Sequence, residues 1–463
     1  MGLLEGIFAF VWYDTHTDTL RYARDSFGVK PLYKYEDARF LILSSEIQGI
    51  LGSGLVGKDI DDSQIYHYLA YRYAEPTQTF FKGIEPVEPC PKKTLPAQHS
   101  EALPALASAL MKQTVGDVPF GIFLSGGVDS TLLLALLQRQ GHTNLPAFTI
   151  AHPAKEASFG TSDAHFARLA AKQYGADLHT LEVDSSALEA LPAFIDRIDQ
   201  PIADGAYWLT EMLSAEARKS VKFVFSGAGA DELFSGYNRH KAYHFYQRYY
   251  GLLMLGYPFL KVLGKVLPTG FAHPYRQYFR LIKKFGQDLS LSPEKTWQNF
   301  IRLSALPAPP VGKGMTGILH DQLYYLQHDV LALTDRASML HALEVRVPYL
   351  DAEVVNYAQN IPLAYQLKHG KKWILKKILS DLGGKVYTTR RKEGFGVPIG
   401  AWLRAPVGKV YVDILQNPKS ILSHYLPARY IQTLVKQHLS YQTDATAELW
   451  ALLVLEMWLQ RQT

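Results

Sequence analysis

Hydrophobic and polar positions alternate in short runs over the first fifty residues of the chain. The runs are rich in aromatic and β-branched residues and are separated by polar turns, as expected for β-strands; they occupy residues 6–14, 19–25, 31–35 and 40–45. This pattern predicts a piece of an antiparallel sheet, in a first unit that ends at residue 83. Residues 84–100 carry four prolines and no periodicity, which predicts a linker between domains.

A different pattern starts after residue 100. Short apolar runs alternate with segments of helical periodicity; the runs lie at residues 121–125, 145–151, 177–183 and 221–227. This alternation predicts an α/β fold, in which a parallel sheet is covered by helices on both faces. Beyond residue 236 the pattern is almost wholly helical. We therefore expect a second domain over residues 101–463 that ends in an α-rich extension.

The composition limits the kinds of partner. The net charge of +5 is small beside 48 basic and 43 acidic residues, so it does not by itself indicate nucleic acid. The apolar stretch at 251–268 is interrupted by Lys261 and Lys265 and cannot span a bilayer. Cys90 is the single cysteine, which excludes an intramolecular disulfide and favours a reducing compartment. We expect a cytoplasmic protein without a nucleic-acid or membrane partner, and the sequence leaves a homodimer open.

The strongest local motif is a turn between a predicted strand and a predicted helix. It reads Ser125-Gly126-Gly127-Val128-Asp129-Ser130 and is followed by the helical run TLLLALLQRQ. The glycine pair lets the backbone approach an anion, and the helix offers free N–H groups and the positive end of its dipole. Pyrophosphate fits this site if a divalent cation bridges it to Asp129. The alternative is an ordinary turn in which Asp129 caps the helix.

A second turn of small residues follows another predicted strand. It runs from Ser226 to Tyr237 with the sequence SGAGADELFSGY. Asp231 adds a carboxylate, so a magnesium ion held between Asp129 and Asp231 is chemically reasonable. The alternative is a helix start with acidic residues near its dipole.

The two turns together carry a family resemblance. SGGVDS resembles the PP-loop of the N-type ATP pyrophosphatases, and the second turn narrows the resemblance to the asparagine synthetases. Three further segments agree with it: Asp199-Gln200-Pro201 with Asp204, the block from Asp335 to Asp351, and residues 391–398. The resemblance covers about residues 3–410. It implies that ATP and Mg²⁺ bind, that the side-chain carboxylate of aspartate becomes an adenylate, and that ammonia then forms the amide, with AMP and pyrophosphate released.

The resemblance also implies roles for single residues. Leu124 and Ile150 would contact adenosine, and Ser226 and Gly227 would hold the AMP portion. Lys392 would neutralise charge at the α-phosphorus, with Asp129 and Asp231 as metal ligands. Glu344 and Arg346 would either line the acceptor site or form a structural ion pair. The full set of expected ATP-binding residues is Leu124, Ser125, Gly126, Gly127, Val128, Asp129, Ser130, Ile150, Ser226 and Gly227.

The N-terminal unit resembles the latter half of a glutaminase domain. Asp25 matches the aspartate that holds the amine of glutamine. The family nucleophile is an N-terminal cysteine, but position 2 is Gly2 and Cys90 lies in the expected linker. We therefore expect no glutaminase activity from this chain. A separate glutaminase subunit, free ammonia or a truncated gene product would each account for this, and the unit is expected to be poorly stable alone.

A second departure concerns the acceptor substrate. The family usually has an acid at the third position of the second turn, where this chain has Ala228. Relatives that cyclise their substrate, such as β-lactam synthetase and lasso-peptide cyclase, also tend to lack this acid. The alternatives to an asparagine synthetase are therefore an ATP-dependent amide-forming cyclase and a non-catalytic nucleotide-binding remnant.

Overall fold

A five-stranded parallel sheet forms the centre of the second domain, with the strand order β10-β9-β6-β7-β8. Its strands are β6 (Phe120–Phe123), β7 (Leu145–Ala151), β8 (Ala176–Glu182), β9 (Phe223–Phe225) and β10 (Glu344–Arg346). The sequence predicted the first four, and the prediction of a parallel sheet is confirmed. β10 was not predicted.

The structure is a computed structural model. It describes residues 4–91, 101–153, 163–266, 276–304, 306, 310, 312, 314–390 and 398–462. Within these ranges no helix has the length and apolar character needed to cross a bilayer.

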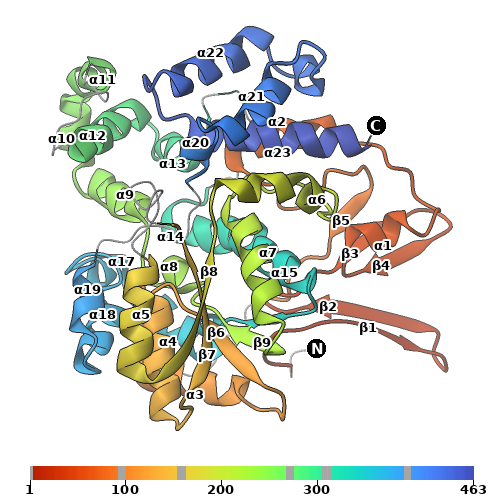
Figure 1. Cartoon of the computed structure of the whole chain (residues 1–463), viewed down its shortest axis with the longest axis vertical. Coiled ribbons are helices and arrows are strands. Elements are labelled where there is room, and N and C mark those ends of the chain that lie inside the picture. Colours follow the sequence, from red (N-terminus) through yellow and green to blue (C-terminus); the bar gives the residue numbers. More distant parts are fainter. Residues whose placement is uncertain are drawn as a thin grey trace.

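Helices cover both faces of the sheet, as predicted. α4 (Val128–Arg139) and α5 (Asp163–Tyr174) lie on one face, and α7 (Ala206–Ala217) and α15 (Ala332–Met339) lie on the other (Figure 1). Every leucine of the run TLLLALLQ in α4 is buried. One side of α4 packs on the sheet, and α3 (Ala102–Gln113) and α18 (Trp373–Asp381) cover the side that faces away from the sheet. The start of α4 is therefore fixed from several sides.

The N-terminal unit contains two small antiparallel sheets. β1 (Ala9–Asp14) and β2 (Thr19–Arg24) form a hairpin that projects from the body (Figure 1). β3 (Tyr33–Glu36), β4 (Leu41–Ser44) and β5 (Ile84–Pro86) form a second sheet with β3 in the middle. The four predicted strands are confirmed. The first three residues of the expected linker are not a linker, because they form strand β5 and pair with β3.

The N-terminal unit shares its core with the second domain. Phe80 and Phe81 are buried, and both rings contact Trp458 of α23 (Thr446–Gln462). The carboxylate of Asp199 accepts hydrogen bonds from the first turn of α1 (Ile47–Leu51). Burial of each such aromatic ring contributes about 1.5–3 kcal/mol. The part of the unit after residue 45 is thus stabilised by the rest of this chain.

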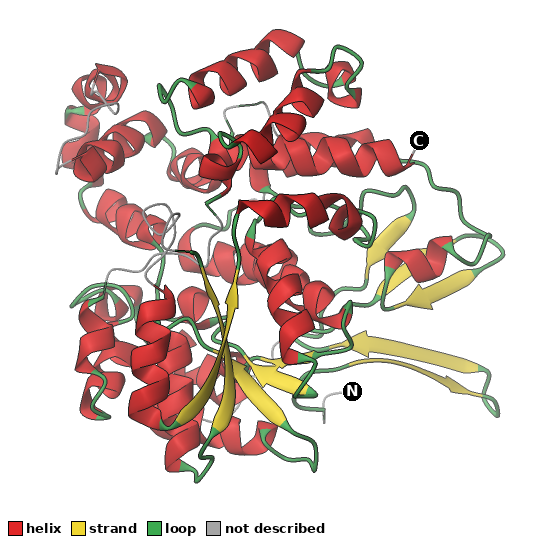
Figure 2. Cartoon of the chain, viewed as in Figure 1, coloured by secondary structure: helices red, strands yellow, loops and turns green. Residues whose placement is uncertain are grey.

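The remaining elements are mostly helices (Figure 2). They are α2 (Asp62–Tyr71), η1 (Ser185–Ala190), α6 (Leu191–Ile195), α8 (Ala230–Leu233), α9 (Asn238–Arg248), α10 (Tyr250–Leu255), α11 (Tyr257–Val266), α12 (Arg276–Asp288), α13 (Pro293–Ile301), α14 (Gly317–His320), the π-helix η2 (Asp321–Leu331), η3 (Pro348–Leu350), α16 (Ala352–Gln359), α17 (Leu363–Gln366), α19 (Lys385–Thr389), α20 (Ile399–Trp402), η4 (Pro406–Gly408), α21 (Lys409–Gln416), η5 (Ile421–His424) and α22 (Ala428–Leu439). The α-rich C-terminal extension is confirmed.

Candidate active site

The glycine turn after β6 is held in one conformation by its surroundings. Gly126 has a φ of +65°, and a Cβ atom there would lie 2.4 Å from the backbone nitrogen of Ala167 in α5. The backbone N–H of Ser125 donates to the hydroxyl of Ser130 over 3.2 Å. The N–H of Gly127 donates to the hydroxyl of Ser125 over 3.3 Å. The turn therefore closes on itself directly above the start of α4.

The second turn lies against the first. β9 and β6 are adjacent parallel strands, so their carboxyl ends open on the same edge of the sheet. A Cβ atom on Gly227 would lie 2.9 Å from the Cβ atom of Asp129 and 3.3 Å from the backbone nitrogen of Ser130. The two turns therefore converge at one edge of the sheet.

A buried lysine joins the two turns. The ammonium of Lys372 lies 2.5 Å from Oδ2 of Asp129 and 2.6 Å from Oδ1 of Asp231, and the residue is only 5% exposed. Burial opposes the charge of Lys372, but the two carboxylates outweigh it and raise the pKa of the lysine above its ordinary value. Lys372 precedes α18 and is 243 positions from Asp129, so local sequence patterns could not predict this contact.

The two carboxylates form a set that fits Mg²⁺. Both approach a single cationic atom, and carboxylate oxygens are the ligands that Mg²⁺ takes from proteins. Mg²⁺ commonly has one or two protein carboxylates, with phosphates and water completing the octahedron. Gly236 makes room for the cluster, because a Cβ atom there would lie 1.7 Å from Oδ1 of Asp231. The lysine ammonium therefore lies between the two carboxylates that are predicted to hold the metal.

Arg390 is a further contact of the first turn that the sequence did not predict. Its Nη1 atom donates to the carbonyl of Ser125 over 2.9 Å, and its guanidinium also pairs with the buried carboxylate of Asp163. The guanidinium lies 4.8 Å from the ring centre of Phe166. Arg390 thereby ties the turn to the first helical turn of α5.

The other expected ATP-binding residues lie at the same edge of the sheet. Leu124 directly follows β6, and Ile150 is the last residue but one of β7; both side chains are buried. Val128 is the first residue of α4. The hydroxyl of Ser226 accepts from the N–H of Ala228 over 3.3 Å. Lys392 lies outside the described residues, so its expected position stays a prediction.

Glu344 and Arg346 form an ion pair. Nε of Arg346 lies 3.0 Å from Oε1 of Glu344. The guanidinium stacks 3.7 Å from the ring centre of Phe223, at the amino end of β9, and also donates to the carbonyl of Gln113. These contacts form the ion pair that the sequence allowed, and a role of Glu344 and Arg346 in acceptor binding stays a prediction.

A buried acid lies next to the lysine cluster. Glu232 is 1% exposed, and its carboxylate accepts a hydrogen bond from the hydroxyl of Tyr237. Burial, aided by the neighbouring charge of Asp231, raises the pKa of Glu232 to about 7. The side of the site beyond Asp231 is therefore poorly solvated.

Two of the family segments lie at the interface between the N-terminal unit and the second domain. Nζ of Lys30 lies 2.8 Å from Oδ1 of Asp335, and the guanidinium of Arg336 donates to the hydroxyl of Tyr33. The amide oxygen of Gln200 accepts from the N–H of Phe80 over 3.1 Å. These contacts hold the two parts together.

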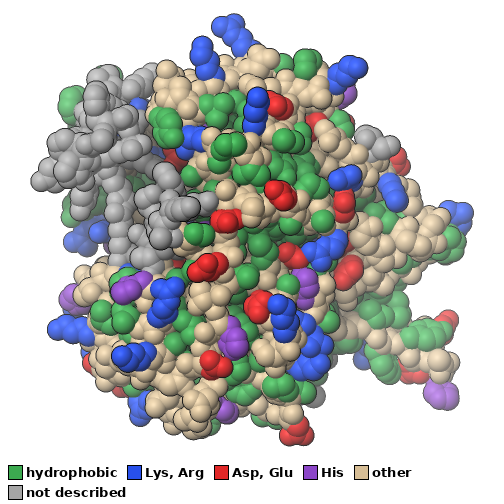
Figure 3. All heavy atoms as spheres, viewed as in Figure 1, with side chains coloured by type: hydrophobic (Ala, Val, Ile, Leu, Met, Phe, Trp, Pro, Cys, Tyr) green, Lys and Arg blue, Asp and Glu red, His purple; other side chains and the backbone are tan. Residues whose placement is uncertain are grey.

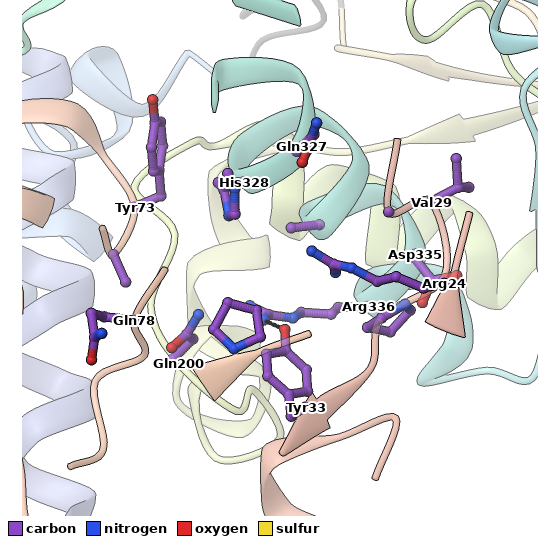
Figure 4. A pocket seen from close by; sticks show the side chains of 15 residues that line it. Arg24, Val29, Tyr33, Tyr73, Gln78, Gln200, Gln327, His328, Asp335 and Arg336 are labelled. Atoms are coloured by element: carbon purple, nitrogen blue, oxygen red, sulfur yellow. Dashed lines mark hydrogen bonds between the residues drawn. The ribbon is translucent and has the colours of Figure 1, made fainter. Parts of the chain in front are cut away.

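A small pocket of about 30 Å³ lies at this interface (Figure 4). Arg24 and Tyr33 reach it from the N-terminal unit, and His328 and Arg336 reach it from η2 and α15. In the described part of the chain, Nε of Arg24 and Nη1 of Arg336 are buried without a hydrogen-bond partner. The pocket therefore lies between the two units and has buried polar atoms from both of them in its wall.

Asp25 follows Arg24 in the sequence, and its carboxylate is hydrogen-bonded within its own loop. Its carboxylate accepts hydrogen bonds from the backbone N–H groups of Phe8, Phe27, Val29 and Lys30 over 3.0–3.4 Å. Four such donors nearly fill the acceptor positions of one carboxylate. The predicted contact of Asp25 with glutamine stays a prediction.

Known proteins resemble the chain along almost all of its length. The profile of the asparagine synthase family matches residues 101–460, and that of the glutamine amidotransferase domain matches residues 1–103. A putative glutamine-hydrolyzing asparagine synthetase of Mycobacterium bovis is 29% identical, over 98% of this chain and 76% of the relative. The glutamine-hydrolyzing asparagine synthetase 1 of Bacillus subtilis is 24% identical, with coverages of 98% and 77%. Amidase chyE of Penicillium rubens is also 24% identical, with coverages of 89% and 74%.

Proposed function

Because the chain belongs to the asparagine synthase family, we propose that it is an ATP-dependent amide ligase that activates the side-chain carboxylate of aspartate. The observation that carries the proposal is the convergence of two glycine turns and of Asp129 and Asp231 at one edge of the sheet. This edge has backbone donors for phosphates and carboxylates for a metal ion. It has no need of a covalent nucleophile.

The reaction consists of two displacements. A carboxylate oxygen of aspartate bonds to the α-phosphorus of ATP while the bond from that phosphorus to pyrophosphate breaks. Ammonia then bonds to the activated carbonyl carbon, the bond to AMP breaks, and the nitrogen loses a proton. The turn at 125–130 and the start of α4 bind the leaving pyrophosphate. Mg²⁺ held by Asp129 and Asp231 would supply positive charge where negative charge accumulates.

Lys372 supports the site before substrates bind. Its ammonium balances two carboxylates that would otherwise repel each other in a buried place. It therefore holds the two turns at the separation that the nucleotide requires. Lys392 is proposed to stabilise the α-phosphorus during the displacement.

The acceptor carboxylate can be identified by the release of pyrophosphate. The purified chain with ATP, Mg²⁺ and ammonium is expected to release pyrophosphate when aspartate is added. Release with a β-amino acid or a peptide, but none with aspartate, would instead indicate a cyclase, the alternative that Ala228 favours. ATP-dependent thermal stabilisation without turnover on any carboxylate would indicate a non-catalytic protein.

The ammonia source is tested separately. We expect no measurable release of glutamate from glutamine, because the chain's one cysteine, Cys90, has its N–H bonded to the carbonyl of Arg24 and has no free α-amine. Ammonium chloride is expected to support amide formation where glutamine does not. Appreciable glutamate release by the purified chain would contradict this prediction.

The β1–β2 hairpin exposes apolar side chains. Val11, Trp12 and Tyr13 of β1 are each about half exposed, and hydrophobic side chains are visible along the projecting hairpin (Figure 3). Such a row on an isolated pair of strands is costly to leave in water. We propose that further polypeptide of the glutaminase domain, from this protein or from a partner, covers it.

A further inference from the structure

The charge of the chain is concentrated in one helical lobe. The stretch from residue 237 to 287 contains no aspartate or glutamate and nine basic residues, so the rest of the chain has 39 basic against 43 acidic residues. The lobe consists of α9, α10, α11 and α12. Those with described side chains that are exposed or partly exposed are Lys241, Arg248, Lys261, Lys283 and Lys284. Arg239 is instead largely buried in an ion pair with Asp321, and Lys284 pairs with Asp288 at the end of α12.

One face of this lobe exposes aliphatic and aromatic side chains. Leu252, Leu255, Phe259 and Val262 are 70%, 85%, 69% and 59% exposed. Their spacing of three, four and three residues places them on one side of the α10–α11 segment. Leu281 and Ile282 of α12 are also about half exposed. Exposed apolar side chains of this lobe therefore come from α10, α11 and α12.

The exposed face is separate from the core of the lobe. Leu253, Met254, Tyr257 and Leu260 point inward and pack on a small cluster around Trp297. The lobe is thus folded without the help of its outer face. Figure 1 places α10, α11 and α12 at the outer margin of the molecule, away from the sheet.

We propose that the α10–α11 face, together with the basic residues around it, binds the surface of an anionic lipid membrane. Helices with apolar residues on one face and Lys or Arg beside it lie in the plane of a membrane interface. Basic residues near anionic headgroups strengthen such binding. This contact is peripheral and involves no spanning helix, and it departs from the expectation of no membrane partner.

Two other occupants fit the face less well. Single-stranded RNA stacks its bases on aromatic rings, whereas three of the four most exposed side chains, Leu252, Leu255 and Val262, are aliphatic. A second copy of the chain would bring the same patch against itself in a two-fold dimer. That arrangement would bring the basic side chains of the two copies, Lys241, Arg248, Lys261 and Lys283 among them, toward each other.

The test is flotation of the full-length chain with lipid vesicles. The protein is expected to bind phosphatidylcholine vesicles that contain phosphatidylglycerol, to bind pure phosphatidylcholine vesicles more weakly, and to lose binding as salt rises. The double variant Leu255→Glu/Phe259→Glu is expected to bind at least about tenfold more weakly. Thermal melting is expected to be unchanged, because both positions are exposed.

The matched control changes equally exposed residues elsewhere. Val115 and Val410 are 75% and 64% exposed, and the variant Val115→Glu/Val410→Glu is expected to bind vesicles like the wild type. Absence of binding to the anionic vesicles would overturn the proposal, as would equal binding by the two double variants. RNA binding or self-association that depends on Leu255 and Phe259, without vesicle binding, would also overturn it. None of these outcomes depends on the proposed ligase reaction.

Discussion

Replacing Lys372 with methionine is expected to destabilise the protein by about 3–5 kcal/mol, the usual cost of removing one partner from a buried ion pair. Methionine keeps the volume of the lysine stem but leaves Asp129 and Asp231 facing each other without a cation. The measurement is the free energy of unfolding in urea, without nucleotide and in EDTA.

The same variant is expected to become sensitive to Mg²⁺. The lysine ammonium competes with a divalent cation for the two carboxylates, so Mg²⁺ should raise the melting temperature of Lys372→Met much more than that of the wild type. The double variant Lys372→Met/Asp129→Asn is expected to recover stability and to lose this response, because one charge has been removed from the pair.

The neighbouring lysine offers a matched control. Lys371 donates to the side-chain oxygen of Asn238 at the surface, and Lys371→Met is expected to change stability by less than about 0.5 kcal/mol. If Lys372→Met melts like the wild type and shows no greater response to Mg²⁺, the two carboxylates do not share a cation site, and the proposed metal position is wrong.

The sequence predicted the parts of the fold that depend on local pattern. β6, β7, β8 and β9 are short apolar runs bounded by turns, and the glycine turns at 125–130 and 226–232 follow directly from them. β10 was missed because Glu344-Val345-Arg346 has no apolar run. It becomes a strand only by pairing with β9, which is a contact between distant parts of the chain.

The side-chain partners of the site were the least predictable part. Lys372 and Arg390 reach the first turn from positions more than two hundred residues away, and local periodicity carries no information on such contacts. Asp199 and Asp335 matched family segments, but the structure uses them to hold the N-terminal unit in place. A motif identifies a family more readily than it assigns the task of each of its residues.

The substitution Gly126→Ala is expected to reduce pyrophosphate release at least about 100-fold, the cost associated with misplacing a bound group by about 1 Å. A methyl group at Gly126 would lie 2.4 Å from the backbone nitrogen of Ala167, so either the turn or α5 must move. The positive φ adds about 1–2 kcal/mol of strain. Because backbone rather than a flexible side chain opposes the methyl group, local rearrangement cannot relieve the clash cheaply.

Gly141 separates the effect of crowding from that of backbone strain. It has a φ of +93° near the other end of α4, and a Cβ atom there would meet nothing within 4 Å. Gly141→Ala therefore carries the strain without the clash, and it is expected to lower stability slightly while leaving the KM for ATP and the rate of pyrophosphate release close to wild type. Similar losses of activity in Gly126→Ala and Gly141→Ala would mean that general destabilisation explains both. A large loss confined to Gly126→Ala, with ATP no longer raising the melting temperature, would place the nucleotide at this turn.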